Sequence, residues 1–315
     1  MSQSRKQLQV LISFGLVYVI WGSTYAAIGI AVEHIPPALM TGVRFLIAGP
    51  LMFLLCIATK RKVRISTRDA GYLALIGILL LTGGNMTLAW SEEYINTGLA
   101  ALIVAIVPLW VALIEGYVLR GDRFAAKGWL GLALGFGGLI VLVWPDLATH
   151  NVAAHKQLIA SIGVVFGSLS WSVGSVLSRR AKVSVDPFAA SAWEMFFASI
   201  ANLLLATILG EWKHTHWDIH GTLAVGYLVI FGSLVGFSAY LWLLDNVPAP
   251  KVSTYAYVNP VVAVILGWLL LGEKLNGFML VGMITIVGAV VLVTSSKLKS
   301  GAKVAENVAP CEAEA

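Results

Sequence analysis

The sequence predicts an all-α polytopic membrane protein in which ten transmembrane helices form two inverted repeats of five helices each. Composition points to a membrane, because 58% of the 315 residues are apolar and 12% are charged. Soluble domains contain about 45 to 50% apolar and about 25% charged residues. Ten separate apolar stretches give the number of helices, and sequence matches at a nearly constant offset indicate the repeat.

Each apolar stretch is about long enough to cross a bilayer as a helix, in which the backbone polar groups satisfy one another. The alternation of apolar and polar residues that marks a membrane β-barrel is missing from these stretches. The first stretch exceeds the apolar core of a signal peptide and no Ala-x-Ala site follows it, so we interpret it as a retained helix. The expected spans are residues 9–31, 38–58, 70–90, 97–119, 124–144, 158–178, 188–209, 221–244, 252–271 and 277–294.

The distribution of Lys and Arg predicts the orientation. With the N-terminus in the cytoplasm, 17 of the 21 Lys and Arg residues fall in inside segments, and three (Lys156, Lys213 and Lys274) fall outside. Because cytoplasmic loops carry an excess of Lys and Arg, we expect both termini in the cytoplasm. The net charge of +5 then reflects topology, and no nucleic-acid partner is needed to explain it.

Internal matches divide the chain into two halves. Trp21 matches Trp171, Pro37 matches Pro187 and Gly138 matches Gly288, all at an offset of 150 residues. Five spans in each half require the second copy to enter the membrane in the opposite direction. We expect a first repeat at residues 9–144, a second at 158–296, and a disordered cytoplasmic tail at 297–315.

Apart from Lys127 near the start of one span, three charged residues lie within the predicted spans: Arg44, Glu115 and Glu194. A charge near the centre of a membrane helix costs about 2.5 to 3.5 kcal/mol. Arg44 and Glu194 occupy the same repeat position, so we expect both to face the interior, where Glu194 is either the partner of Arg44 or a separate polar anchor. Two alternatives remain. Arg44 would bind the carboxylate of a substrate, or its side chain would extend towards outside water or Glu92. Glu115 either faces the cytoplasmic interface or takes part in proton coupling.

Polar and aromatic residues that share helical faces are candidates for a solute cavity. Such faces arise where residues stand three or four apart. Aromatic walls with a few hydroxyl and amide groups suit a small amphiphilic solute. The same residues would also serve as close-packing or interface positions. The candidates are Trp21, Thr24, Tyr25, Asn85, Trp171, Ser172, Ser175, Tyr255 and Asn259, with Thr82 on the same face as Asn85.

Proline and glycine residues have mainly structural interpretations. Pro108 and Pro260 each remove a backbone hydrogen bond, so we expect a kink, which either acts as a pivot or serves packing alone. The Gly-x-x-x-Gly pairs Gly131–Gly135 and Gly232–Gly236 are expected to let helices approach closely.

Motifs for metal, disulfide and nucleotide chemistry are missing. Cys56 lies in a predicted helix and Cys311 in the tail, so we expect no disulfide framework. All six His residues fall in predicted outside loops and no His-Glu-x-x-His occurs, which disfavours a hydrolase or metalloprotease. We expect no cofactor and no metal site; His214, His216 and His220 are interpreted as a solvated loop. No P-loop is present, so an ATP-driven pump would need a partner subunit.

Three segments resemble the EamA domains of the drug/metabolite transporter superfamily: WGSTYAAI (21–28), GVRFLIAG (42–49) and YAYVNPVVAVILGWLLLGEKL (255–275). The resemblance covers residues 9–296 and is closest to bacterial ten-helix inner-membrane permeases. It implies an inverted-repeat fold with a central cavity that exports amino acids, metabolites or drugs across the plasma membrane without ATP. The expected partners are a small-molecule solute and the lipid bilayer, and the oligomeric state stays open. A membrane-embedded enzyme or a channel-like facilitator is the alternative function.

Overall fold

The computed structural model describes residues 3–115, 126–149, 151–247, 252 and 255–306. Every regular element in these ranges is a helix, and no strand occurs in them. The prediction of an all-helical fold is therefore confirmed. Residues 116–125, which include the ends of two predicted spans, and Cys311 lie outside the described part of the chain.

Helices follow the predicted spans closely, and two of the spans contain a π-helical segment. The helices of the first half are α1 (Gln3–Val32), α2 (Pro37–Ala58), α3 (Thr67–Gly77), π-helical η1 (Ile78–Met86), α4 (Thr87–Ser91), α5 (Thr97–Val104), α6 (Val107–Leu113) and α7 (Ala126–Ala148). Those of the second half are α8 (Val152–Arg180), α9 (Pro187–Ile208), the 3₁₀-helix η3 (Glu211–His214), α10 (Ile219–Tyr227), π-helical η4 (Leu228–Val235), α11 (Gly236–Asn246), α13 (Tyr255–Leu271) and α14 (Gly277–Glu306).

Seven of the described helical segments are long and apolar enough to cross a membrane. Three more apolar segments, Thr97–Leu113, Val258–Leu271 and Gly277–Val293, are shorter. Because a helix rises about 1.5 Å per residue, these shorter segments cover less of the roughly 30 Å hydrocarbon core than the long ones do. The helices therefore establish a membrane-type fold without fixing the number of spans at ten.

Matching positions in the two halves adopt matching structures. The first and last residues of α2 and α9 are 150 positions apart, and η1 and η4 begin 150 positions apart. Both α2 and α9 have Pro in the first helical turn, where a missing N–H costs nothing. Beyond their last residues, Lys60 (φ 56°) and Gly210 (φ 71°) take the same left-handed conformation, which Gly adopts without strain.

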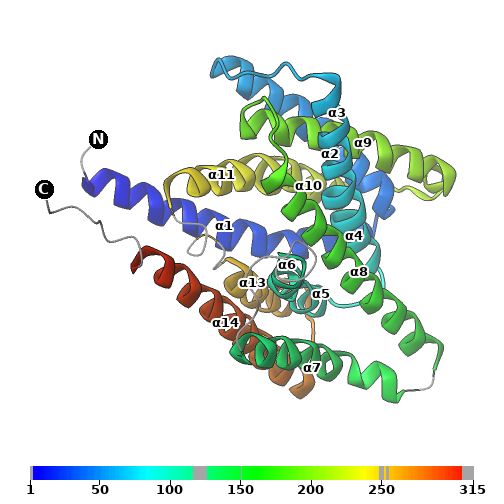
Figure 1. Ribbon diagram of the computed structural model, residues 1–315. Coiled ribbons are helices and arrows are strands. Elements are labelled where there is room, and N and C mark those ends of the chain that lie inside the picture. The colour runs from blue at the N-terminus through cyan, green and yellow to red at the C-terminus, as the bar shows by residue number, and fades with distance from the viewer. Residues whose placement is uncertain (1–2, 116–125, 150, 248–251, 253–254, 307–315) are drawn as a thin grey trace, which may run out of the picture.

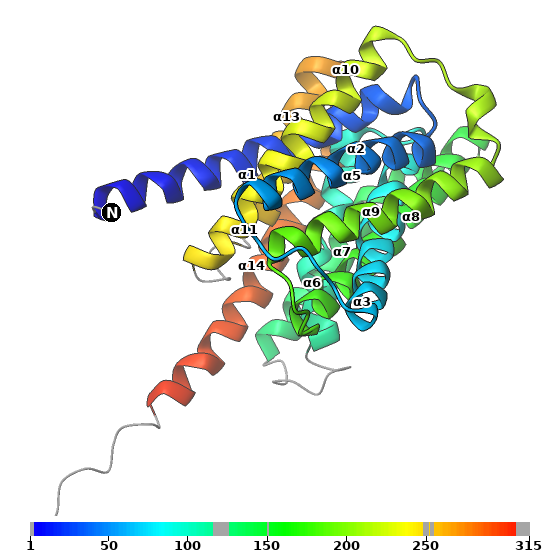
Figure 2. The ribbon, with the colours of Figure 1, turned by 90° about the horizontal axis from the view of Figure 1, so that it is seen from above.

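Close helix pairs organise the bundle. The helices α2 and α9 pack along their length, and so do α7 and α14, which lie side by side in Figure 1. Figure 2 shows α2 beside α9 from a second direction. At the α7–α14 contact, a side chain on Gly131 would meet Ala289 and Val293, and one on Gly135 would meet Leu109. The expected close approach at this Gly-x-x-x-Gly pair is present.

We call the end of the bundle at which α1 ends the distal face; it carries residues 33–36, 92–96, 209–218 and 272–276. The opposite end, with residues 59–66 and 181–186, is the proximal face. Hydrogen bonds across the two halves join the chain at both faces. His216 N donates to His34 O at 3.0 Å at the distal face, and Trp193 Nε1 donates to Val63 O at 2.9 Å at the proximal face.

Each end of the α2–α9 pair is clamped by a charged residue that follows the partner helix. At the distal face the Glu211 carboxylate accepts the backbone N–H of Leu39 at 2.7 Å, in the first turn of α2. At the proximal face Arg61 binds Asp186 at 2.8 Å, and Asp186 accepts the N–H of Phe188 in the first turn of α9. Residues 61 and 211 are 150 positions apart. Arg61 therefore acts at the start of α9 as Glu211 acts at the start of α2, although the two side chains carry opposite charges.

Two features differ from the sequence interpretation. The helix α14 continues to Glu306, ten residues into the predicted disordered tail; the sequence KLKSGAKVAE contains many good helix formers and extends the preceding helix. Pro108 follows a break between α5 and α6, whereas Pro260 lies inside the uninterrupted α13. The two prolines therefore occupy different local structures.

Candidate functional site

The two π-helical segments lie against the central helices of both halves. The segment η1 packs against α8 and α9, and η4 packs against α1 and α2. Each accepts a hydrogen bond from a neighbouring helix: Ser170 Oγ donates to Leu79 O at 2.8 Å, and Trp21 Nε1 donates to Gly232 O at 3.2 Å. π-Helical turns are rare and often occur at functional sites, which directs attention to the side chains around them.

Arg44 connects the two π-helical segments. Its side chain extends from α2 and is 3% exposed. Its Nε donates to Ser233 Oγ in η4 at 3.0 Å, and its Nη1 donates to Asn85 Oδ1 in η1 at 3.3 Å. Among the residues that the structure describes, no carboxylate lies within ion-pair distance of this guanidinium. Arg44 is thus a buried cation held by neutral partners from both halves.

Glycine makes room for this arrangement. A Cβ atom on Gly232 would lie 3.1 Å from Arg44 Nη2 and 3.0 Å from Thr24 Cγ2. A side chain on Gly236 would meet the Trp21 indole. The Gly232–Gly236 pair, expected only to bring helices together, therefore also accommodates Arg44 and Trp21. Ser233 was not a sequence candidate, although its place beside a conspicuous glycine pair was a usable signal.

Trp21 of the first half packs among aromatic rings of the second half. The Trp21 ring lies 5.0 Å from Tyr240, 5.3 Å from Tyr255 and 5.5 Å from Phe237, centroid to centroid. Thr24 Oγ1 is bonded to its own helix, at Trp21 O. Edge-to-face contacts of this kind build a rigid aromatic wall.

Tyr25 and Asn259 also lie inside the bundle, at 9% and 7% exposure. With its amide oriented to match its surroundings, Asn259 donates to the carbonyl oxygens of Tyr255 and Tyr18 at 3.2 Å. Its polar group therefore satisfies backbone carbonyls within the protein.

The candidates in α8 contact neighbouring helices or their own helix. Trp171 packs on Gly84 in η1, the counterpart of the Trp21 contact with η4. Ser172 Oγ donates to Ser168 O at 2.7 Å within α8, and no hydrogen bond of Ser175 is recorded in the described part of the chain. Thr82 Oγ1 is buried without a partner there, whereas Asn85 Oδ1 accepts a hydrogen bond from Arg44.

The remaining intramembrane charges occupy separate places. Glu194 is 6% exposed in α9, and its backbone lies against Gly77; no ion pair joins it to Arg44 in the described structure. Glu115 pairs with Arg179 at 3.0 Å, where both side chains are partly exposed. Arg44 and Glu194 are thus both buried, and no ion pair joins them in the described structure.

Histidine side chains form no metal centre within the described ranges. There, no three His, Cys, Asp or Glu side chains come together in a way that would hold a metal ion. His34 lies 3.4 Å from Asp218 and its ring stacks near that of His220.

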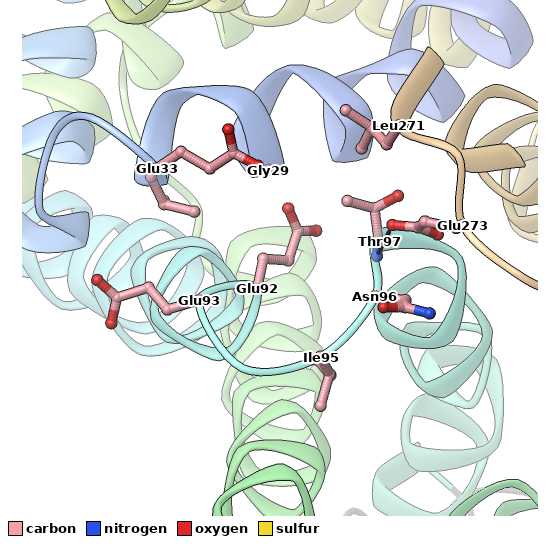
Figure 3. Close-up of a pocket in the computed structure, with 10 residues that line it drawn as sticks. Gly29, Glu33, Glu92, Glu93, Ile95, Asn96, Thr97, Leu271 and Glu273 are labelled. Carbon is pink, nitrogen blue, oxygen red and sulfur yellow. Dashed lines mark hydrogen bonds between the residues drawn. The ribbon is translucent and has the colours of Figure 1, made fainter. Parts of the chain in front are cut away.

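A pocket of about 350 Å³ opens at the distal face, away from Arg44. Four carboxylates line it: Glu33, Glu92, Glu93 and Glu273 (Figure 3). Sequence reasoning considered Glu92 only as a possible partner for Arg44, because it stands at the end of an apolar span and not within one.

Comparison with known proteins identifies the family to which this architecture belongs. The EamA-like transporter family model matches residues 9–144 and 158–295. The chain is 39% identical over 299 residues to the uncharacterized inner membrane transporter YedA of Escherichia coli (strain K12), covering 94% of each chain. It is 22% identical to the uncharacterized transporter YoaV of Bacillus subtilis (strain 168), covering 89% of this chain and 94% of that protein.

A solved crystal structure superimposes with a TM-score of 0.63 at 20% identity, covering 94% of this chain and 100% of that one. This likeness supports the fold alone. The two family matches, the coverage of the relatives and the apolar helices agree with one another. The chain therefore belongs to the EamA-like transporter family.

Proposed function

We propose that the protein is a secondary transporter that exports small metabolites, amino acids or drugs across the plasma membrane. Transport would proceed by alternating access through a central cavity between two inverted five-helix repeats, residues 9–144 and 158–296. The family and the names of the relatives support transport in general. The equal bounds of α2 and α9, shifted by 150 residues, support the repeat.

The contact of Arg44 with both π-helical segments is the observation that carries the proposal. Inverted repeats place solute sites near the midplane, where the halves meet. Arg44 bonds to η4 through Ser233 and to η1 through Asn85, so it lies where elements of the two halves meet. A buried guanidinium without a carboxylate partner is suited to bind the carboxylate of a solute in two-point geometry.

The distribution of basic residues supports an orientation. Loops of the proximal face carry Lys60, Arg61, Lys62 and Arg64, whereas Lys213 is the basic residue between α9 and α10 apart from histidines. We infer that the proximal face is cytoplasmic and the distal face external, with both termini inside. Single cysteines at positions 62 and 213 test this by labelling from outside in intact cells; reaction at 213 and silence at 62 is expected.

A solute screen tests the function. Purified protein is first scanned by thermal shift against amino acids and small metabolites, and stabilising compounds are then followed by isotope counterflow in proteoliposomes. We expect a carboxylate-bearing solute to stabilise the wild type and not Arg44→Gln, with Lys213→Gln as a control for loss of one positive charge. The inverse pattern, or equal stabilisation of Arg44→Gln, contradicts an Arg44 solute site.

The same vesicles separate the alternatives. An alternating-access transporter shows faster uptake when unlabelled solute is present on the opposite side, whereas a channel-like facilitator does not. A membrane-embedded enzyme returns a chemically altered solute, which mass spectrometry of the vesicle contents detects.

A further inference from the structure

The distal pocket holds a carboxylate that lacks any partner in the described structure. Glu92 is 8% exposed, and both of its side-chain oxygens are buried without a hydrogen bond. Figure 3 shows its carboxylate at the centre of the pocket, between Glu33 on one side and Thr97 and Glu273 on the other. An unmatched buried carboxylate is costly, so it requires either a proton or a cation from outside the chain.

Neighbouring groups define what the pocket offers. Glu273 is already engaged, because its oxygens accept the backbone N–H groups of Thr97 at 2.6 Å and Gly98 at 3.1 Å. The Thr97 hydroxyl is buried and has no partner among the described residues. Figure 3 shows the Thr97 methyl group on the side of Glu92 and the Thr97 hydroxyl on the side of Glu273. The two oxygens of Glu92 therefore remain as the acceptors at the centre of the pocket.

The pocket lining favours one class of ligand. It contains four carboxylates and no Lys, Arg or His, so an anion would be repelled. Its walls include Val32, Ile95 and Leu271, and its volume of about 350 Å³ is at the small end for ligand sites. A metal ion is disfavoured, since no group of three His, Cys, Asp or Glu side chains within the described ranges would hold one.

We propose that the distal pocket binds the ammonium group of a small aliphatic amine, with Glu92 as its counter-ion. A primary ammonium has three N–H donors, two of which match the free oxygens of Glu92. The apolar walls contact the alkyl chain. The site lies apart from Arg44, and its test is equilibrium binding, so it stands or falls independently of the proposed transport.

Protonation of Glu92 competes with the amine. Burial raises the pKa of Glu92 well above its usual range, and the negative charge of Glu273 raises it further. In the part of the chain that the structure describes, the titratable groups that line the pocket or couple to Glu92 are Tyr25 of α1, Glu33, Glu93 and Glu273, and none of them is basic. Burial and the nearby Glu211 also raise the pKa of Glu93, to about 7.

The sign of the pH effect follows. Since the amine binds only ionised Glu92, affinity rises with pH, and below the pKa of Glu92 the Kd increases about tenfold for each pH unit lost. The probe itself keeps its charge, because an alkylammonium titrates near the lysine value of about 10.4. One proton is released for each amine bound while Glu92 is mainly protonated.

The experiment is calorimetric titration of the purified full-length protein with n-butylammonium chloride at pH 6, 7 and 8. Tetramethylammonium chloride at equal concentration is the matched salt, because it carries the charge without N–H donors. We expect saturable binding of n-butylammonium that tightens with pH, and no saturable binding of tetramethylammonium. Absence of saturation, or equal binding of both cations, overturns the proposal.

Variants assign the site to its residues. Glu92→Gln keeps the shape and removes the charge, so the Kd is expected to rise more than about tenfold and to lose its pH dependence. Glu33→Gln removes the same charge from an exposed position and is expected to weaken binding by less than about threefold. Unchanged affinity in Glu92→Gln refutes the proposal. Should that variant misfold, Glu92→Asp decides, because it keeps the charge and withdraws it by one methylene: a Kd raised about threefold or more supports the site, and an unchanged Kd contradicts it.

Discussion

Arg44 and Glu194 occupy equivalent positions of the two halves, yet their surroundings differ. Both are buried, and the helices that carry them pack on equivalent π-helical segments, α2 on η4 and α9 on η1. Arg44 bonds to Ser233 of one segment and reaches Asn85 of the other. Glu194 instead lies with its backbone pressed against Gly77. The backbone thus matches at positions 150 residues apart, whereas the side-chain contacts at those positions differ.

The largest expected effect comes from removing the Arg44 charge. Arg44→Leu leaves Ser233 and Asn85 without their donor and removes the proposed solute contact, so the initial transport rate should fall more than about tenfold. The rate is measured in proteoliposomes at equal protein, with monodispersity checked by size exclusion. Normal abundance together with normal transport in Arg44→Leu would show that the Arg44 charge is not needed for folding or transport.

Exchanging the two charges tests whether their equivalence is functional. Arg44→Glu and Glu194→Arg are each expected to impair folding or transport, because each places an unmatched charge in the interior. Since Arg44 contacts Ser233 and Asn85 and not Glu194, the losses should add in the double variant. A double-mutant cycle on transport rate measures this, and recovery in the double variant would instead reveal direct pairing.

Gly232 sharpens the comparison at the η4 side. A Cβ there would lie within 3.1 Å of Arg44 Nη2, so Gly232→Ala should displace the guanidinium and lower the transport rate about threefold or more. Gly226→Ala is the control, since nothing lies within 4 Å of a Cβ at that position. Thermal midpoints of the purified variants separate loss of function from loss of stability. Equal rates in both variants would contradict a need for space beside Arg44.

The smallest expected difference is between two serines. Ser233→Ala removes a hydrogen bond to Arg44, whereas Ser170→Ala removes one to the Leu79 carbonyl in η1. Each should cost about 0.5 to 1.5 kcal/mol of stability, but only Ser233→Ala should raise the KM for solute. Urea or thermal unfolding and transport kinetics measure the two quantities. A higher KM in Ser170→Ala would extend the functional region to the other half.

Sequence alone predicted the helices well, because an apolar stretch as long as a bilayer is thick has few other structures open to it. Arg44 was recognisable as one charge in an apolar run. The hydrogen-bond partners of Arg44 could not be recognised in the same way. The predicted helix faces assume 3.6 residues per turn, whereas the π-helical turns of η1 and η4 rotate each following side chain to a different face of the helix.

Glu92 escaped sequence analysis on different grounds. It follows α4 in a segment that also contains Glu93 and Tyr94, where a carboxylate is ordinary. Its lack of partners depends on how residues 29–33, 97 and 271–273 surround it. Glu273, for example, lies 181 positions after Glu92 in the chain, so these contacts leave no local pattern in the sequence.

The clamps at the two ends of the α2–α9 pair have a mechanical consequence. Glu211 at one end and the Arg61–Asp186 pair at the other attach charged groups to opposite helix starts, and hydrogen bonds to charged groups contribute about 1.5 to 3 kcal/mol each. We therefore expect α2 and α9 to behave as one rigid body. A rearrangement that exposes Arg44 first to one side of the membrane and then to the other would therefore be made by the surrounding helices. These helices would move relative to a fixed α2–α9 pair.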